Sequence, residues 1–341
     1  MRPFNHINAA SIAEAGEALK KGGAVAVAGG GDLLGALKDN IFPEYPRTVV
    51  NLKSIPGLNY IKFEDGALKL GALTTLADIA RSPIVGEHAP ALAAAAKSAS
   101  SPALRETTTI GGNLCQLPRC WYFRKLNNRF DCARKGGERC FALTGDNRYH
   151  SVFGGAGFEA PGGQRACVAV NQGELAPVLI AMAARLKTTT REIEAFNFFD
   201  VGVLSSTVLE AGELLTEIEI PPLGFAETCR YRRFAFRKSI DFPIINLSIA
   251  RGGENPNSPG KPRWHICIGG VAPTPHIAKA AEELLNVNAP SAADLTPELA
   301  QAAGVAATEG ARAFESNAYK LQLIKTLIKR ELLAMSAPPA D

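Results

Sequence analysis

The chain carries four cysteines, Cys120, Cys132, Cys140 and Cys167, shortly after a glycine-rich segment, residues 109–113. Thiolates are soft ligands that suit zinc or an iron–sulfur cluster. Glycine-rich turns that open a helix hold phosphate groups through their backbone amides. A thiolate site beside such a turn indicates two redox cofactors side by side, in a protein that passes electrons rather than binding a substrate of its own.

The spacing of these cysteines, C-x11-C-x7-C-x26-C, does not identify the metal. It lacks the C-x2-4-C pairs of structural zinc sites and is looser than bacterial ferredoxin motifs. Residues 119–140 carry seven basic and two acidic side chains, a net charge of +5. This basic collar would offset the negative charge of four thiolates and of a pyrophosphate. The alternatives are a solvated basic loop or a nucleic-acid patch, and Cys115 could replace Cys120 as a ligand.

Composition argues against several classes of protein. Seven cysteines is an odd number, and residues 1–23 have no apolar signal core, which disfavours a disulfide framework. We therefore expect reduced thiols and a cytoplasmic location, with export beside a signal-bearing partner as the alternative. The net charge of +4 does not argue for nucleic acid or a membrane surface. No run of about 18 apolar residues predicts a membrane span.

Two turns are rich in glycine. Residues 24–27 predict a short buried strand that leads through three consecutive glycines, Gly29 to Gly31, into a helical pattern. This first turn lacks the G-x-G-x-x-G pattern, so we do not expect a Rossmann fold. The second turn, residues 109–113, adds hydroxyl and amide side chains suited to phosphate and ribose. The two turns together indicate a ligand that contains a pyrophosphate.

Regular periodicity is lost between about residues 116 and 163, where aromatic side chains argue against disorder. A metal centre could order this segment. Pro221, Pro222 and Gly224 predict a boundary between domains at 1–222 and 223–341. The second domain has an α+β pattern, with strands predicted at 231–237, 244–251 and 264–271 and helices at 274–285, 297–309 and 317–334.

Several segments together resemble a known family: AGGGDLL (28–34), TTIGGNL (108–114), DFPIINLSIA (241–250) and ICIGGVAPTPHIAKAAEELL (266–285). They are similar to the FAD-binding medium subunit of molybdenum hydroxylases, the xanthine dehydrogenase and carbon monoxide dehydrogenase superfamily. The cysteine segment, at about 115–167, looks like an insertion of the branch that carries an extra [4Fe-4S] cluster. That branch includes aldehyde oxidoreductase and 4-hydroxybenzoyl-CoA reductase.

The resemblance implies a fold and a set of site residues. The fold would be an FAD-binding domain of two α+β subdomains, followed by a C-terminal domain with a three-stranded antiparallel sheet and helices. The cluster ligands would be Cys120, Cys132, Cys140 and Cys167, and Cys115 would not be a ligand. The FAD contacts would be Val27, Ala28, Gly29, Gly30, Gly31, Asp32, Leu33, Thr109, Gly111, Gly112, Asn113, Glu174, Leu215 and Arg233. Glu174 stands where the family usually has Asp, and Gly31 where it commonly has Thr.

The resemblance also implies partners. A molybdopterin-cofactor subunit would carry out the substrate chemistry, and a [2Fe-2S] subunit would relay single electrons within the same hetero-oligomer. FAD in this chain would link those carriers to an electron donor or acceptor, and no acid–base catalyst is expected. Two other functions remain open: a zinc-stabilised nucleic-acid-binding protein, and a stand-alone flavoprotein oxidase with a structural zinc. His150 is interpreted as a loop-bonding histidine rather than one that tunes a cluster.

Overall fold

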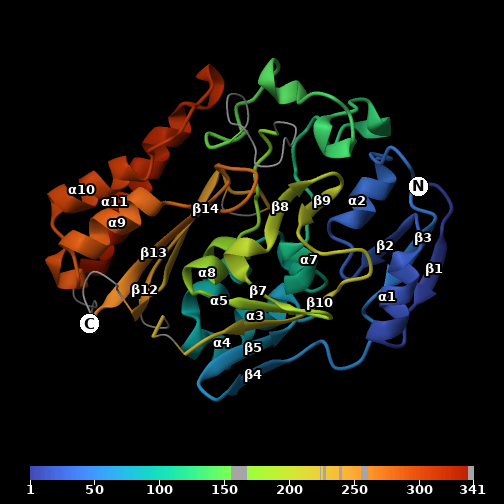
Figure 1. The fold of residues 1–341 in the computed structure, drawn as a ribbon, viewed down its shortest axis with the longest axis horizontal. Coiled ribbons are helices and arrows are strands. Elements are labelled where there is room, and N and C mark those ends of the chain that lie inside the picture. The colour runs from blue at the N-terminus through green and yellow to red at the C-terminus, as the bar shows by residue number, and fades with distance from the viewer. Residues whose placement is uncertain (155–166, 223, 226–227, 238–239, 255–259, 337–341) are drawn as a thin grey trace.

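The computed structural model describes residues 1–154, 167–222, 224–225, 228–237, 240–254 and 260–336. Residues 155–166 of the predicted insertion and residues 337–341 of the predicted C-terminal domain lie outside that part. Helices combined with mainly antiparallel sheets confirm the α+β prediction. Figure 1 shows an N-terminal sheet and a C-terminal sheet on opposite sides of a central unit, with the green insertion across the top.

The N-terminal sheet is parallel and has the order β1-β3-β2. Its elements are β1 (Asn5–Asn8), α1 (Ile12–Lys20), β2 (Ala24–Val27), α2 (Leu33–Lys38) and β3 (Thr48–Asn51). Ser11 caps α1 by accepting a hydrogen bond from the amide of Glu14. The strand predicted at 24–27 is confirmed as β2. The first glycine turn follows it directly, at the edge of the sheet where the parallel strands end.

The central unit is an antiparallel sheet covered by short helices, with the order β4-β5-β10-β6-β7. Its strands are β4 (Ile61–Glu64), β5 (Ala67–Gly71), β6 (Arg185–Thr188), β7 (Glu192–Glu194) and β10 (Leu215–Ile220). Its helices are α3 (Leu76–Arg81), α4 (Pro83–His88), α5 (Pro90–Ser98), α6 (Pro102–Arg105), α7 (Ile110–Leu114) and α8 (Leu175–Ala181). Buried alanines of α5 let the helix pack closely on α3 and α8.

The C-terminal sheet is antiparallel and has the order β11-β12-β13-β14. Its elements are β11 (Arg230–Phe234), β12 (Ile245–Glu254), β13 (Pro262–Gly269), β14 (His276–Ile277), α9 (Lys279–Asn288), α10 (Pro297–Ala306) and α11 (Tyr319–Ser336). The three predicted strands are present, and the two-residue β14 adds a fourth. The helix predicted from residue 274 begins at Lys279 because Pro275 disfavours helical backbone at Thr274 and the chain first pairs with β13.

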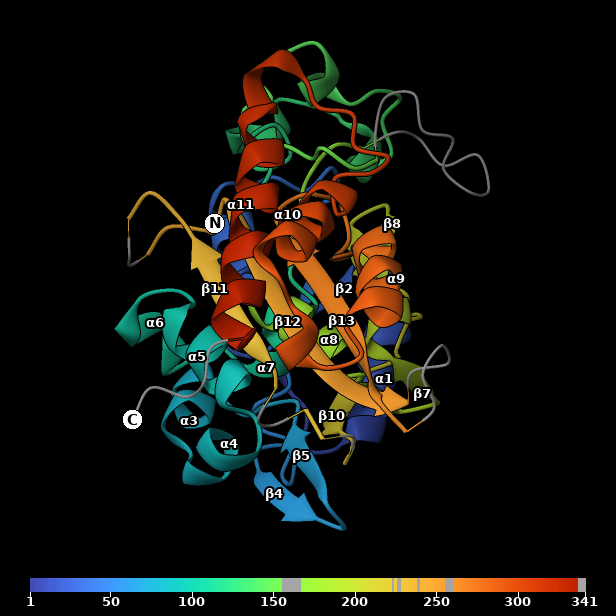
Figure 2. The ribbon, with the colours of Figure 1, turned by 90° about the vertical axis from the view of Figure 1, so that its left-hand side faces the viewer.

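The described part of the insertion has only three short 3-10 turns, Leu126–Asn128, Ala133–Lys135 and Phe141–Leu143. Figures 1 and 2 agree that it caps one end of the molecule. Phe123, which is 1% exposed, anchors it in the core beside Leu37 and Ile41. The strand pair β8 (Phe199–Gly202) and β9 (Ser205–Thr207) supports it from below through Arg134. No helix in the described part of the chain is long and apolar enough to span a membrane.

Candidate functional site

The first glycine turn, residues 28–33, is built for close backbone approach. A Cβ on Gly29 would lie 1.9 Å from the carbonyl oxygen of Thr107, and Gly30 has a φ of +74° that favours glycine. Among the described residues, the amides of residues 29–33 donate to no backbone carbonyl. These free amides at the start of α2 form a surface that can receive a phosphate.

The second glycine turn is fixed against the segment after β5, and the residues just before it, Thr107 and Thr108, lie against the first glycine turn. The amides of Ile110 and Gly111 donate to the carbonyls of Thr74 and Ala72, each at 2.9 Å. Thr109 caps α7 by accepting a hydrogen bond from the amide of Gly112 at 3.1 Å. A Cβ on Gly111 would lie 2.8 Å from the Ala72 carbonyl, so only glycine lets this turn pack so closely. The structure thus joins the two predicted turns into one cradle.

A buried polar group lies beside the second turn. Glu174 is 4% exposed, and burial raises the pKa of its carboxyl to about 7, against the opposing influence of Arg233 and Arg119. Asn246 holds the turn before α8 by donating to the carbonyl of Gly173 at 3.1 Å. A Cβ on Gly173 would lie 3.6 Å from Asn113 Oδ1, which places the second glycine turn next to this turn.

Several buried polar atoms around the cradle lack a hydrogen-bond partner in the described part of the chain. They are Asn113 Oδ1, Arg119 Nε, Gln172 Oε1 and Arg233 Nε. Buried polar atoms are rarely left unsatisfied, and a polar ligand would complete them. Free turn amides, glycines that a Cβ would obstruct and unpaired polar atoms together fit a nucleotide cofactor such as FAD.

Replacement of Glu174 by glutamine is expected to stabilise the FAD-free chain above pH 8 and to have little effect near pH 4. Folding raises the pKa of this carboxyl from 4.5 to about 7, so its stability contribution is complete below pH 4.5 and is lost as the pH rises through 7. The full difference corresponds to about 3 kcal/mol. Urea unfolding of both proteins at several pH values measures it, and a pH-independent difference would contradict the assignment.

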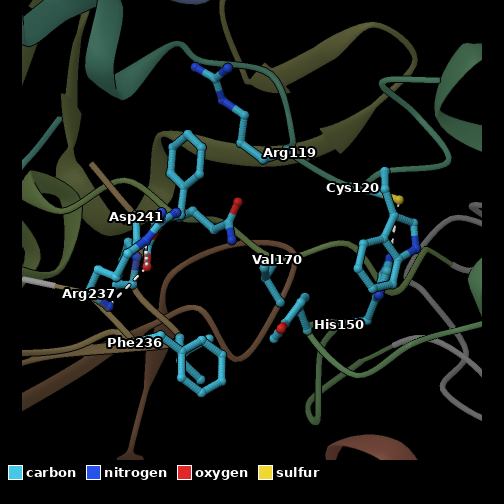
Figure 3. A pocket seen from close by; sticks show the side chains of 13 residues that line it. Arg119, Cys120, His150, Val170, Phe236, Arg237 and Asp241 are labelled. Atoms are coloured by element: carbon cyan, nitrogen blue, oxygen red, sulfur yellow. Dashed lines mark hydrogen bonds and ion pairs between the residues drawn. The ribbon is translucent and has the colours of Figure 1, made fainter. Parts of the chain in front are cut away.

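A cavity of about 570 Å³ opens between the insertion and the segment before β12. Figure 3 shows Cys120 and His150 on one side and Phe236, Arg237 and Asp241 on the other. The guanidinium of Arg119 lies 5.0 Å from the ring centroid of Phe242 and also forms an ion pair with Asp32 at 2.9 Å. The cavity therefore adjoins the first glycine turn, and its volume suits a cofactor ring system.

The four predicted cysteines meet at a second, much smaller cavity of about 10 Å³. Cys120, Cys132, Cys140 and Cys167 all line it, and Cys115 does not. Within the described residues, no three Cys, His, Asp or Glu side chains converge tightly enough to hold a single metal ion. Burial raises the pKa of Cys120 to about 12, so this thiol stays protonated at neutral pH unless a metal displaces the proton.

Asp32 joins the insertion to the first glycine turn. Its carboxylate accepts hydrogen bonds from Arg124 at 2.6 Å and from the Leu117 amide at 3.0 Å, besides pairing with Arg119. The Asp32 carboxylate is therefore occupied by these protein contacts, so only the backbone amide of Asp32 would be available to bind a pyrophosphate. These arginines belong to the predicted basic collar.

Other members of the collar are also turned inward. Arg134 is 4% exposed and donates to Ser206 Oγ at 3.0 Å, and Lys135 is 5% exposed and donates to Asn128 at 2.8 Å. Only Lys125, Arg129 and Arg139 of the seven basic residues are exposed. A collar of this kind offers little free charge to a nucleic acid, because most of its cations already have protein partners.

Replacement of Asp32 by asparagine is expected to lower the free energy of unfolding by about 2 kcal/mol, because it leaves two half-buried guanidiniums without their anion. Asp146→Asn is the matched control: Asp146 pairs with Arg148 at 2.8 Å on the surface, so stability should barely change. Urea unfolding of the FAD-free proteins provides the comparison. Equal losses in the two variants would show that Asp32 does not anchor the insertion.

None of the fourteen predicted FAD contacts is among the residues that line the large cavity. Leu215 lies in β10 and packs in the central core, 8% exposed. Arg233 lies on β11 and donates to the carbonyl of Asp241, so it borders the cavity from behind. Arg119, Gln172 and Phe242 line the large cavity but were not among the site residues predicted from the sequence. The only sequence signal for Phe242 is its place in the DFPIINLSIA segment, which indicates the family but not a role for this side chain.

Known proteins resemble this chain over most of its length. Residues 2–223 match the FAD binding domain in molybdopterin dehydrogenase. The aldehyde oxidoreductase FAD-binding subunit PaoB of Escherichia coli K12 is 30% identical, over 86% of this chain and 89% of that protein. The nicotinate dehydrogenase FAD-subunit of Eubacterium barkeri is 26% identical, over 89% of this chain and 85% of its own.

A solved structure agrees with this fold. A chain in the structure of carbon monoxide dehydrogenase from Hydrogenophaga pseudoflava superimposes with a TM-score of 0.71 at 24% identity, covering 99% of this chain and 100% of that one. The agreement extends across the N-terminal, central and C-terminal units. With the family match and the FAD-suited cradle, it leads to one conclusion: the chain belongs to the FAD-binding domain family of the molybdopterin dehydrogenases and is an oxidoreductase subunit.

Proposed function

We propose that this chain is the electron-transfer subunit, carrying FAD and a [4Fe-4S] cluster, of a molybdenum-containing hydroxylase or of an aldehyde or aromatic acyl-CoA oxidoreductase. It would link a molybdopterin subunit and a [2Fe-2S] subunit to an electron donor or acceptor. The observation that carries the proposal is the position of Cys120, which lines both the large cavity and the four-cysteine cavity. A single residue therefore separates the two candidate cofactor sites.

The chain's own groups have distinct tasks in this proposal. The amides of residues 29–33 and the Thr109–Asn113 turn would hold the pyrophosphate and the ADP half, with Glu174 at the ribose or adenine. The flavin ring would enter the large cavity, where Phe242 and Arg119 exclude water and Cys120 forms the wall toward the cluster. When bound, FAD exchanges electron pairs with an external partner and single electrons with iron–sulfur carriers.

The distribution of the cysteines favours a cluster over a single ion. A tetrahedral zinc ion, with Zn–S bonds of about 2.3 Å, draws its four sulfurs onto one centre. Each thiolate of a four-iron cluster binds a different iron, which suits cysteines spread around a cavity. The cavity of about 10 Å³ has room for roughly one water molecule, so we expect the insertion to expand as the cluster assembles.

The proposal extends to organisation and location. The FAD-binding domain would span residues 1–222 with the [4Fe-4S] insertion at about 115–167, and the C-terminal domain would span 223–341. Relatives carry names such as carbon monoxide dehydrogenase medium chain and 6-hydroxypseudooxynicotine dehydrogenase complex subunit alpha, which supports a hetero-oligomer. We propose a cytoplasmic complex, with export beside a signal-bearing partner as the alternative.

Cofactor analysis of the anaerobically purified chain tests this function. We expect about one FAD and about four iron and four acid-labile sulfide per chain, with flavin bands over a broad brown absorption. Zinc in place of iron, with FAD present, would instead support a flavoprotein oxidase with a structural zinc. A colourless zinc protein whose DNA affinity falls steeply with salt would support the nucleic-acid alternative.

A further inference from the structure

We propose that His150 donates a hydrogen bond to the thiolate of Cys120 and thereby raises the reduction potential of the cluster. The inference rests on the proposed function, since it requires the [4Fe-4S] cluster. His150 would be a positioning residue for electron transfer, not a ligand. Its effect would be exerted through Cys120, the cysteine that also faces the large cavity.

The contact between His150 and Cys120 is short and lies on the side of the large cavity. His150 Nε2 lies 3.2 Å from Cys120 Sγ. The imidazole lines the large cavity together with Cys120 but does not line the four-cysteine cavity. His150 therefore contacts the sulfur from the side of the large cavity. From that side it can donate to a ligand sulfur but cannot readily replace one.

The ring's surroundings decide which nitrogen carries the proton. Nδ1 is buried and has no hydrogen-bond partner among the described residues. A metal-bound thiolate has no proton of its own and can only accept. A proton on Nε2 satisfies the sulfur, whereas a proton on Nδ1 would leave a buried donor unpaired and set two lone pairs against each other.

The main chain around His150 is held by two buried residues from the start of α11 and the turn before it. Asn317, which is fully buried, donates to the carbonyls of His150 at 3.2 Å and of Ser151 at 3.0 Å. The ammonium of Lys320 donates to the carbonyls of Tyr149 and His150, each at 2.9 Å. The C-terminal part of the chain therefore fixes the backbone that carries the imidazole.

Burial makes this hydrogen bond effective. His150 is 3% exposed, and its ring packs at 5.6 Å from Trp121 and 6.0 Å from Tyr122, centroid to centroid. With water excluded, a donor to sulfur stabilises the more negative, reduced cluster more strongly than the oxidised one. Lys320 is buried as well, at 1% exposed, and it donates hydrogen bonds to the carbonyls of His150 and Gly270.

The hydrogen bond can be tested in the unmodified protein. The anaerobically reconstituted full chain, grown with ¹⁵N-histidine, is reduced and examined by pulsed EPR. We expect a weak histidine nitrogen coupling to the reduced cluster. No coupling would overturn the inference, and so would a strong coupling typical of direct ligation. A protein without iron would instead refute the proposed function.

Variants test the consequence for the potential. His150→Phe keeps the aromatic packing but removes the donor, and should shift the reduction equilibrium of the cluster about tenfold toward the oxidised form, about 59 mV for one electron. His150→Gln, which keeps an N–H donor, should restore part of the shift. His276→Phe is the control, because His276 is a half-buried histidine that stacks on Phe153 at 3.8 Å.

The results of these titrations discriminate clearly. Full iron content with an unchanged cluster potential in His150→Phe would overturn the inference and leave the proposed function intact. If His150→Phe fails to retain the cluster, the inference is tested by the cluster potential of His150→Gln and by the histidine nitrogen coupling in the unmodified protein. An equal shift in His276→Phe would also overturn it, because the effect would then not depend on contact with Cys120.

Discussion

Alanine at position 29 is expected to abolish tight FAD binding, with an affinity at least about 100-fold below that of the unmodified chain. The added Cβ would lie 1.9 Å from the Thr107 carbonyl oxygen and 2.9 Å from the Cα of Thr108, which are both backbone atoms. The first glycine turn would have to move away from the second by more than 1 Å, and such overpacking costs about 1–3 kcal/mol or more. Flavin fluorescence quenching during titration of the FAD-free proteins measures the change.

Gly35 provides the matched control for this substitution. It lies six residues further on in α2, and a Cβ there would meet no atom within 4 Å. Gly35→Ala should therefore leave FAD affinity unchanged and stabilise the helix by about 0.5–1 kcal/mol. If Gly29→Ala bound FAD as tightly as Gly35→Ala, the cradle formed by the two turns would not be the FAD site.

Local sequence patterns were sufficient for much of the fold. The apolar run at 24–27 followed by glycines predicted β2 and the turn into α2. Three consecutive glycines would destabilise the interior of a helix or strand, so they favour a turn. The strands β11, β12 and β13 were recognisable from their β-branched and aromatic content. The helical spacing of apolar residues at 317–334 likewise predicted α11, which begins at Tyr319.

The pairing of distant strands could not be predicted in the same way. β10 lies between β5 and β6, so Ile218 pairs with Leu70 across about 150 residues of intervening chain. Nothing local to either strand specifies that partner, since an alternating pattern fits many neighbours equally well. The insertion is a similar case, because its shape comes from Phe123 and from the Asp32 ion pairs rather than from periodicity.

The candidate site likewise has features that local sequence predicts and features that depend on contacts between distant residues. The glycine turns carry their chemistry in consecutive residues and were found from the sequence. The shared cavity of the four cysteines was implied only by the family resemblance, because the spacing alone fits several metals. The contact between His150 and Cys120 joins residues 30 positions apart in an irregular segment, so only the structure could reveal it. Arg119 and Phe242 were missed for the same reason.

Loss of a cluster cysteine should remove the iron and spare the flavin. Cys132→Ala is expected to lower iron and acid-labile sulfide at least about tenfold, because a cluster without its fourth thiolate is exposed to solvent and readily lost. Cys132 lines the four-cysteine cavity, to which neither glycine turn contributes a lining residue. The Asp32 ion pairs that hold the insertion to the FAD cradle involve residues 119 and 124, which precede it. Iron analysis and quantification of released FAD in the same samples measure both effects.

Cys115→Ala is the control that makes this result informative. Cys115 follows α7, packs against the central core and does not line the four-cysteine cavity, although it is only five residues from Cys120. Its removal should leave the iron content unchanged. If Cys115→Ala lost iron and Cys132→Ala retained it, the cluster would have to be bound by a different set of thiols. Retention in both would mean that the metal is not held by this cavity, because a buried four-cysteine site cannot lose a ligand without losing affinity.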